Sequence, residues 1–207
     1  MNKILLIGPP GAGKTVIANK ISEEFKIPFI KTGSLLRDLP KTDPNYKMIH
    51  ESMDSGKLAP NKLVGDIVSK EVSRYPNGFV LDGWMRQLSD KEVFNPELDF
   101  VIFLNCPKES CKDRILNRVV CEIHNIVYSY SEKVCALCGG NLSKRSDDTV
   151  ETFENRWKVF EELTLPVIEY YKSKNLLLNI DASKSIPEIM NEIKKGLEWL
   201  NLKHLAK

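Results

Sequence analysis

One glycine-rich octapeptide has the residue types and spacing of a phosphate-binding loop. Gly8-Pro9-Pro10-Gly11-Ala12-Gly13-Lys14-Thr15 fits G-x-x-x-x-G-K-[ST] and lies between an apolar run and a stretch of helical periodicity, as that pattern requires. Glycines let backbone N–H groups surround phosphate oxygens, and a helix N-terminus adds its dipole. Lys14 would supply a positive charge at the transferred phosphate, and the Thr15 hydroxyl is suited to Mg²⁺. The alternative is a glycine-rich turn with no ligand.

An aspartate at the end of an apolar run is the expected second magnesium ligand. Asp82 follows Phe79-Val80-Leu81, which places it at the carboxyl edge of a sheet, where ligands bind in open α/β folds. A strand-end aspartate is by itself more often a helix or turn cap. Beside a phosphate-binding loop, the better interpretation is that Asp82 holds Mg²⁺ directly or through water.

Several arginines gather near predicted strand ends and in the segments between them. They are Arg37, Arg86, Arg114, Arg118, Arg145 and Arg156. Any one of them is by default a solvated surface charge. Their joint placement is better explained by a reaction that joins two polyphosphates, because guanidinium groups match the negative charge that spreads over a moving phosphoryl group.

A second constellation has metal-ligand spacing. Cys121-Glu122-Ile123-His124 and Cys135-Ala136-Leu137-Cys138 give C-x₂-H and C-x₂-C, a pairing that suits tetrahedral Zn²⁺. Four protein ligands leave no open position, so the predicted role is structural. A disulfide and a metal-free segment are the alternatives. Cys106 and Cys111 are expected to be small buried hydrophobic residues.

The elements that must position these groups follow from the order of apolar and amphipathic segments. Buried strands are expected over residues 3–7, 28–31, 79–82, 99–105 and 176–181, with helices over 14–25, 108–119 and 186–200. Alternating strands and helices predict a parallel sheet covered on both faces. Residues 32–75 hold about three helical stretches and residues 120–148 are irregular, so we interpret both segments as insertions in one core domain.

Composition excludes several classes of protein. The chain has 207 residues, is 42% hydrophobic and 28% charged and carries a net charge of +2, which indicates one globular domain with insertions. This balance does not favour nucleic acid or a membrane as the main partner. The apolar runs are too short to span a bilayer, and the N-terminus lacks a signal peptide pattern. We therefore expect a soluble, cytoplasmic protein.

Taken together, the motifs resemble those of the adenylate kinase family of nucleoside monophosphate kinases, from Lys3 to about Ile193. The matching segments are Gly8–Thr15 (family G-x-P-G-x-G-K-G-T), Thr32–Arg37 (T-G-D-x-L-R), Asp54–Ala59 (D-x-G-x-L-V), Asp82–Arg86 (D-G-F-P-R), Arg114 with Arg118 (D-R-x-x-x-R), Arg145–Asp148 (R-x-D-D), Arg156, and Asp181–Lys184 (D-G-T-K). Ser34 replaces the usual aspartate, and Met85 replaces the usual proline.

The resemblance implies a fold and a reaction. The fold is an α/β, P-loop NTPase-type five-stranded parallel sheet with helices on both faces, a monophosphate-binding (NMP) insertion and a zinc-ribbon-like lid. The implied boundaries are residues 1–31, 63–119 and 149–207 for the core, 32–62 for the NMP insertion and 120–148 for the lid. The implied reaction is Mg-ATP + AMP ⇌ 2 ADP, catalysed by positioning, charge neutralisation and exclusion of water rather than by a general base.

The resemblance also assigns roles to residues. The catalytic set is Lys14, Asp82, Arg86, Arg118, Arg145 and Arg156. ATP would be bound by Gly11, Ala12, Gly13, Lys14, Thr15, Arg114, Arg118, Val127, Tyr128 and Lys184. The monophosphate would be bound by Thr32, Gly33, Arg37, Lys57, Leu58, Ala59, Gly83, Arg86, Asp90, Arg145 and Arg156. Thr15 and Asp82 would hold Mg²⁺, and Cys121, His124, Cys135 and Cys138 would hold Zn²⁺, with His124 as a variant ligand.

One departure from the family concerns the base of the monophosphate. The adenine-reading glutamine normally stands four residues after the arginine of D-G-F-P-R, and here that position is Asp90. An amide both donates and accepts hydrogen bonds, whereas an ionised carboxylate only accepts. Asp90 could accept from the adenine or cytosine amino group or pair with guanine, and Gln87 could instead reach the base if the loop is rearranged. We therefore expect looser base selectivity, extending to other nucleotides.

Two other functions and one association surface remain as alternatives. The first is a P-loop ATPase or switch protein of adenylate-kinase-like fold, and the second is a kinase that phosphorylates a small alcohol. A kinase of the alcohol type would need an acidic base, whereas this pocket is rich in arginine. Trp199, Leu202 and Leu205 or Ala206 form an apolar stripe at the C-terminus. The stripe would either cover the sheet edge or join copies of the chain, so we expect a monomer or a homo-oligomer formed through this helix.

Overall fold

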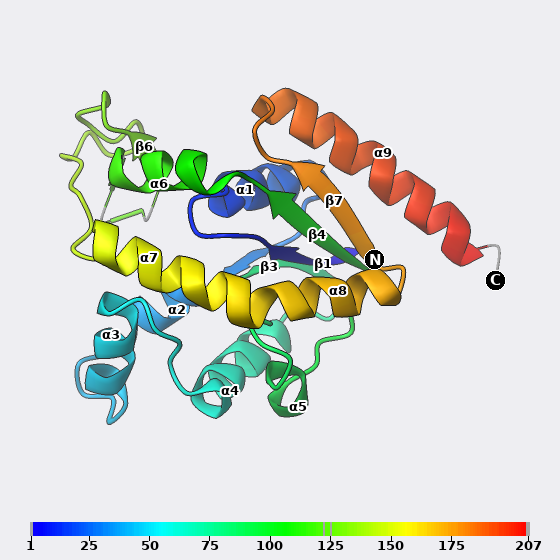
Figure 1. Cartoon of the computed structure of the whole chain (residues 1–207), viewed down its shortest axis with the longest axis horizontal. Coiled ribbons are helices and arrows are strands. Elements are labelled where there is room, and N and C mark those ends of the chain that lie inside the picture. Colours follow the sequence, from blue (N-terminus) through cyan, green and yellow to red (C-terminus); the bar gives the residue numbers. More distant parts are fainter. Residues whose placement is uncertain (1, 122, 125, 206–207) are drawn as a thin grey trace.

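A parallel sheet forms the centre of the molecule. The computed structural model describes residues 2–121, 123, 124 and 126–205, and the side chains of all of these except Ser129 and residues 199–205. The sheet has five strands in the order β2-β3-β1-β4-β7 (Figure 1). Their bounds are β1 (Asn2–Ile7), β2 (Phe29–Lys31), β3 (Gly78–Asp82), β4 (Phe100–Asn105) and β7 (Leu177–Asp181). The predicted five-stranded parallel sheet is confirmed.

Helices cover both faces of this sheet because its strands bury side chains on both sides. Ile4 and Leu6 of β1 belong to one apolar cluster with α1 (Lys14–Phe25), α6 (Lys108–Leu116), α7 (Val150–Val159) and α9 (Ile186–Leu205). Leu5 and Ile7 belong to the opposite cluster with α2 (Thr32–Arg37), α3 (Tyr46–Asp54), α4 (Asn61–Val72) and α8 (Leu165–Ser173). This alternation along one strand is the period of two that a sheet buried on both faces demands. The small helix α5 (Asp90–Val93) follows β3.

The strand register brings the predicted chemistry to one edge. Leu6 of β1 and Lys31 of β2 both pair with Asp82 of β3. The loop that follows β1 therefore begins beside Asp82 and the end of β2. The carboxyl ends of these three neighbouring strands form the floor of the site described below.

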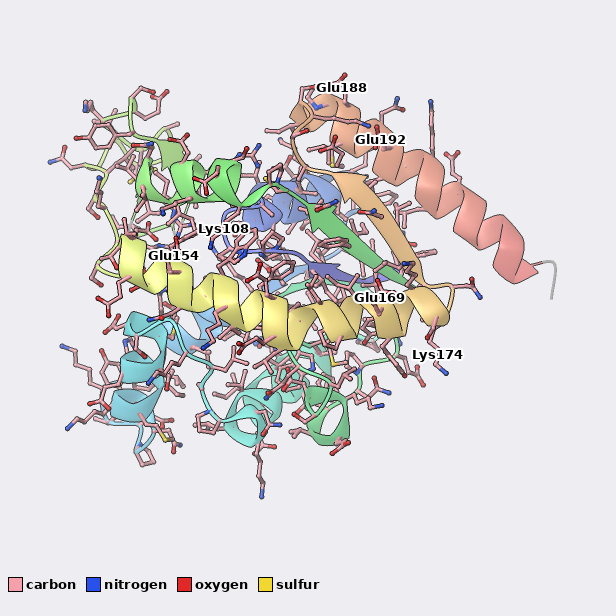
Figure 2. All side chains as sticks on the ribbon, viewed as in Figure 1. Lys108, Glu154, Glu169, Lys174, Glu188 and Glu192 are labelled. Atoms are coloured by element: carbon pink, nitrogen blue, oxygen red, sulfur yellow. The ribbon has the colours of Figure 1, made fainter. Side chains whose placement is uncertain are left out.

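The long helix that crosses the middle of Figure 1 contains a π-helical turn. This turn, η1 (Phe160–Thr164), joins α7 to α8. Pro166 lies in the first turn of α8 and has no backbone N–H, so the regular hydrogen-bond ladder is interrupted there. Single π-helical turns of this kind are often found at functional sites. The other end of α7 contacts α6, since Glu154 pairs with Lys108 at 2.7 Å (Figure 2). Glu154 also pairs with Lys112 at 2.9 Å.

The predicted C-terminal end of the helix before the lid is wrong. The periodicity predicts a helix over residues 108–119, but α6 ends at Leu116. Arg118 and Val119 instead lie in β5 (Arg118–Val120), which pairs antiparallel with β6 (Val127–Ser129). Val120 also exchanges backbone hydrogen bonds with Ser143, and that pairing favours the extended conformation over another helical turn.

The C-terminal helix is longer than predicted. The periodicity predicts an end at Leu200, whereas α9 continues to Leu205 and runs past the sheet (Figure 1). The side chains of the stripe at Trp199, Leu202 and Leu205, and all of Ala206, lie outside the described residues. None of the described helices combines the length and apolar character needed to cross a membrane.

Candidate active site

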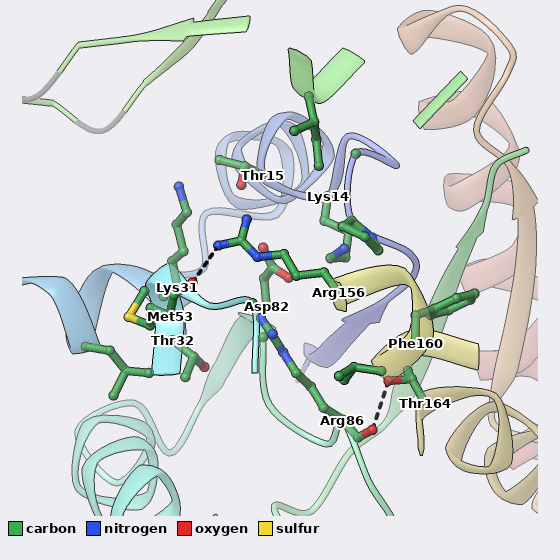
Figure 3. Close-up of a pocket in the computed structure, with 18 of the residues that line it drawn as sticks. Lys14, Thr15, Lys31, Thr32, Met53, Asp82, Arg86, Arg156, Phe160 and Thr164 are labelled. Carbon is green, nitrogen blue, oxygen red and sulfur yellow. Dashed lines mark hydrogen bonds between the residues drawn. The ribbon is translucent and has the colours of Figure 1, made fainter. Parts of the chain in front are cut away.

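A cavity of about 590 Å³ opens above the carboxyl edge of the sheet (Figure 3). Its walls come from the phosphate-binding loop, the segment around α2, residues Gly56–Ala59, the turn after β3, the end of α6, the lid and the middle of the α7–α8 helix. The volume lies within the ordinary range for small-molecule sites. Most of the predicted site residues line it, so the sequence predicted this assembly from segments far apart in the chain.

The glycine-rich loop is shaped by close approaches that only glycine permits. Gly11 has φ +88°, and a Cβ at that position would lie 2.2 Å from the carbonyl oxygen of Cys111. Lys14 donates hydrogen bonds to the carbonyl oxygens of Gly8 (2.7 Å) and Pro9 (2.8 Å), which folds the ammonium group across the loop. Desolvation lowers the pKa of Lys14 to about 8, against the opposing effect of Asp82. A bound polyphosphate would raise this pKa again by supplying negative charge.

The turn after β3 fixes the backbone of Arg86 from two sides. Asp90 accepts hydrogen bonds from the backbone N–H groups of Arg86 (2.8 Å) and Gln87 (3.2 Å). The hydroxyl of Thr164, in the π-helical turn, donates to the carbonyl oxygen of Arg86 at 2.8 Å (Figure 3). The Arg86 side chain opens onto the cavity, and desolvation by the surrounding protein lowers its pKa although Asp82 acts in the opposite direction.

Asp147 joins two of the predicted phosphate-binding arginines. Its carboxylate is within 2.5 Å of Arg156 and 3.2 Å of Arg37. Burial opposes ionisation of Asp147, but Arg156, Arg37 and Arg145 together lower its pKa below the usual value. The guanidinium of Arg156 also donates to the carbonyl oxygen of Met53 at 3.1 Å (Figure 3). The last turn of α3 is thereby tied to α7.

The remaining arginines are held in different ways. Arg118 makes a bidentate pair with Asp148 (2.7 and 2.6 Å), and Arg114 donates to the carbonyl oxygen of Ala182 at 3.0 Å. Arg145 has a buried Nη2 without a hydrogen-bond partner among the described residues, and desolvation together with Arg37 and Arg118 lowers its pKa to about 10. The buried Thr32 hydroxyl is likewise unpaired and faces the cavity wall. Both residues line the cavity, where a ligand or a water molecule can supply the missing partner.

The lid brings the predicted metal ligands together. The ligand atoms of Cys121, His124, Cys135 and Cys138 all lie within 4.8 Å of one another. The sulfurs of Cys121 and Cys138 are 3.8 Å apart, and Nδ1 of His124 is 3.4 and 3.6 Å from the sulfurs of Cys121 and Cys135. Tetrahedral bonds of about 2.3 Å to sulfur and about 2.0 Å to nitrogen imply separations of roughly 3.8 and 3.5 Å. The donor set therefore fits a zinc-sized ion.

Two residues predicted to bind ATP do not line the cavity. Ala12 is buried, and its N–H bonds to the carbonyl oxygen of Pro9. Lys184 is part of a surface ion pair with Glu192. Val127 and Tyr128 do line the cavity, but the Tyr128 hydroxyl lies 3.3 Å from the sulfur of Cys135 and accepts from the N–H of Ala136. Cys106 and Cys111 are 4% and 0% exposed, as predicted.

The sequence interpretation missed one cation. Lys31 ends β2 and lines the cavity, next to Thr32 in sequence and to Asp82 in register. The signal was present in the sequence, since a lysine at the carboxyl end of a buried strand faces the edge where ligands bind. Lys31 lies just before Thr32–Arg37, outside the residues that match a family motif.

The site combines a phosphate-binding loop, a strand-end carboxylate and a cavity lined by arginines. This combination is typical of a P-loop phosphotransferase of nucleotides. Comparison with known proteins narrows this class. Residues 6–176 match the family model of adenylate kinase. The chain is similar to three proteins named adenylate kinase along almost their whole length. It is 38% identical to the one from Carboxydothermus hydrogenoformans, over 95% of this chain and 99% of the relative. It is 36% identical to those from Thermoanaerobacter sp. and Archaeoglobus fulgidus, in each case over 94% of this chain and 97% of the relative.

The chain belongs to the adenylate kinase family. It is accordingly a nucleoside monophosphate kinase, and the family's substrates are Mg-ATP and AMP. The comparisons do not favour the alternative of a P-loop ATPase or switch protein.

Proposed function

We propose that the chain transfers the γ-phosphoryl group of Mg-ATP to AMP through the residues that line the cavity. The observation that carries this proposal is that one cavity is bounded by the phosphate-binding loop on one side and by Thr32–Arg37 and Leu58–Ala59 on the other, with arginines between them. Two phosphate-bearing ligands can then meet over Asp82 and Arg86. An acceptor that is itself a phosphate needs no general base, because its oxygen is already ionised.

In this proposal the triphosphate lies along the loop. The backbone around Gly11 and Gly13 and the Lys14 ammonium bind its phosphates, while Arg118 and Arg114 approach from the lid side. Mg²⁺, held by Thr15 and Asp82 through oxygen ligands, neutralises charge on the phosphates. The buried position of Asp82, 7% exposed yet on the cavity wall, supports a role with a cation there.

The monophosphate lies on the other side of Asp82. Its phosphate is bound by Arg37, Arg86, Arg145 and Arg156, and its base enters the region of Leu58, Ala59 and Gly83. The unpaired polar atoms on Thr32 and Arg145 support this placement. Lys57 lines the same wall but is exposed, so its backbone rather than its ammonium group is the proposed contact.

The lid is proposed to hold one structural Zn²⁺. Cys121, His124, Cys135 and Cys138 would fill all four positions of the ion, which would then stiffen the segment that carries Val127, Tyr128 and Arg145. The separations of the sulfur and nitrogen atoms support this assignment. The division into a core, an NMP insertion (32–62) and a lid (120–148) is part of the same proposal.

A coupled assay with Mg-ATP and AMP, CMP, GMP or UMP in separate reactions tests both the activity and its base selectivity. Turnover with AMP is expected, with further turnover with other monophosphates, because Asp90 stands where the family has an adenine-reading amide. A preference for AMP above roughly a hundredfold, near the limit that one polar contact provides, would refute the relaxed selectivity. Hydrolysis of ATP without any need for a monophosphate would refute the kinase proposal.

A further inference from the structure

Lys31 is a cation of the site to which no motif assigns a role. It is the last residue of β2, pairs in register with Asp82 and lines the cavity together with Lys14, Thr15 and Arg37. In a parallel sheet, residues that pair in register lie about 5 Å apart and direct their side chains to the same face. Figure 3 shows the Lys31 side chain extending from the strand end past the Arg156 guanidinium, toward the level of Thr15.

The ammonium group of Lys31 has no hydrogen bond or ion pair within the described part of the chain. Its surroundings are crowded with like charge, since Arg145 from the lid, Arg37 from α2 and Arg118 from β5 act on it, and Asp82 is the carboxylate that acts against them. Desolvation comes first among the causes that lower its pKa to about 8. Lys31 is partly exposed and lines the cavity, so its ammonium group is accessible to a ligand there.

A bound anion would neutralise the positive charge that surrounds Lys31. A phosphate among Lys31, Arg37 and Arg145 would supply the negative charge that these cations lack, and Thr32, whose buried hydroxyl is unpaired, is the next residue in the chain. An ammonium group is also a rotatable point donor, which suits an acceptor oxygen that changes position during transfer. Resting on the function proposed above, this places the group at the acceptor side of the reaction.

We propose that Lys31 binds the phosphate of the nucleoside monophosphate and stays in contact with the acceptor oxygen as it takes up the transferred phosphoryl group. The bond formed joins that oxygen to the incoming phosphorus, and the bond broken joins the same phosphorus to the bridging oxygen of the donor nucleotide. Lys31 transfers no proton in this step. It offsets negative charge, as the neighbouring guanidinium groups do.

The test measures binding of AMP and of adenosine by calorimetry, with the wild-type protein, Lys31→Gln and Lys31→Arg. A hydrogen bond to a charged group contributes enough to change affinity by roughly tenfold to a hundredfold. Lys31→Gln should therefore weaken AMP binding by at least tenfold and leave adenosine and Mg-ATP within threefold of wild type. Lys31→Arg should recover part of the loss. Lys70→Gln, at an exposed position of α4 away from the cavity, is the matched control and should change nothing.

Thermal unfolding without ligand separates this proposal from a purely structural pairing of Lys31 with Asp82. Removal of a desolvated cation crowded by arginines should leave the melting temperature unchanged or raise it. A fall in melting temperature together with AMP affinity within threefold of wild type would overturn the proposal, as would unchanged AMP affinity alone.

The pH dependence of kcat/KM for AMP at saturating Mg-ATP tests whether AMP needs the positive charge of Lys31. The cationic groups facing Lys31 are arginines, which stay protonated, and the triphosphate raises the pKa of Lys14. The wild-type profile should fall as the pH rises past about 8, and Lys31→Gln should lack that fall. If the wild-type protein binds AMP but does not phosphorylate it, the proposed function is refuted. The AMP affinities of wild type and Lys31→Gln would still show whether Lys31 binds the phosphate.

Discussion

The carboxylate of Asp90 accepts the backbone N–H of Arg86 at 2.8 Å, four residues earlier in the chain. The same oxygen accepts from Gln87, and Asp90 is 4% exposed, so the carboxylate belongs to the turn that carries Arg86. Met85 within this turn has φ +56°, which a proline cannot adopt because its ring fixes φ near −65°. Met85 and Asp90, two of the departures from the family pattern, therefore lie in and stabilise the same turn.

We predict that Asp90→Ala lowers kcat/KM for AMP by about tenfold. Two backbone N–H groups lose a charged acceptor, and the backbone that positions the Arg86 side chain becomes more mobile. Asp90→Asn keeps an acceptor oxygen and should lose less. Steady-state assays with AMP, GMP and CMP measure both effects. The order of preference among the three bases should be the same in both variants. A reordering in Asp90→Asn would show instead that Asp90 reads the base.

Much of the fold could be predicted because its signals are local. Each strand is an apolar run flanked by turn residues, and helix α1 begins and ends where the periodicity predicts. The end of α6 was predicted wrongly because Arg118 and Val119 continue the helical spacing, while their conformation is decided by strand pairing of β5 with β6 and with Ser143, which lie outside the segment itself. The sequence pattern of a segment cannot show such a partner.

The site was predictable where a motif carried it. Lys14, Asp82 and the arginines lie on the cavity as expected, whereas Lys184 does not. The positions of Asp90 and Lys31 depend on tertiary structure. A carboxylate at position 90 could bind a ligand or accept hydrogen bonds from the turn that precedes it. Which of these two roles Asp90 has depends on the path of the backbone. Lys31 lies at the site because β2 pairs with β3 and places it beside Asp82. The sequence alone does not show which strands are neighbours.

Lys14→Ala and Arg86→Ala are each predicted to lower kcat by at least about a hundredfold, as the loss of one preorganised charge-stabilising donor does elsewhere. Both side chains open onto the cavity rather than the core, so the fold should persist. Circular dichroism and a coupled kinase assay measure the two properties. Arg74→Ala is the control, because Arg74 is exposed and pairs only with nearby Glu71 among the described acidic residues. Near-wild-type rates for either active-site variant would mean that the site is misassigned.

Metal analysis of the purified protein should find about one zinc per chain, since structural sites of this type use four protein ligands. His124→Ala and Cys138→Ser should lower that content and make the lid more sensitive to protease, because the knuckles of β5–β6 and of Cys135–Cys138 lose the ion that joins them. Cys106→Ala, which changes a buried core cysteine, should keep the metal. Equal metal content in His124→Ala and wild type would contradict the ligand set.

The contacts of Asp147 predict an acid-sensitive part of the stability. The pKa of this carboxyl is lowered in the folded protein by Arg156, Arg37 and Arg145 against the opposing effect of burial. A group whose folded pKa is depressed contributes stability above its unfolded pKa of about 3.9, and this contribution is lost as the pH falls through the folded pKa. Urea unfolding of wild type and Asp147→Asn at several pH values measures this contribution.

At pH 7 the Asp147→Asn variant should be less stable by about 2 kcal/mol. This is below the cost of breaking a fully buried pair, because the side chains of Arg37 and Arg156 are 26% and 18% exposed. The gap should begin to narrow near pH 4, where Asp147 of the unfolded chain takes up a proton, and should close as the pH falls through the depressed pKa of the folded protein. Glu51→Gln, in an exposed pair with Lys47, should change stability by less than about 0.5 kcal/mol. A difference between wild type and Asp147→Asn that stays constant from pH 7 to pH 3 would show that packing, and not the charge of Asp147, holds Arg37 to Arg156.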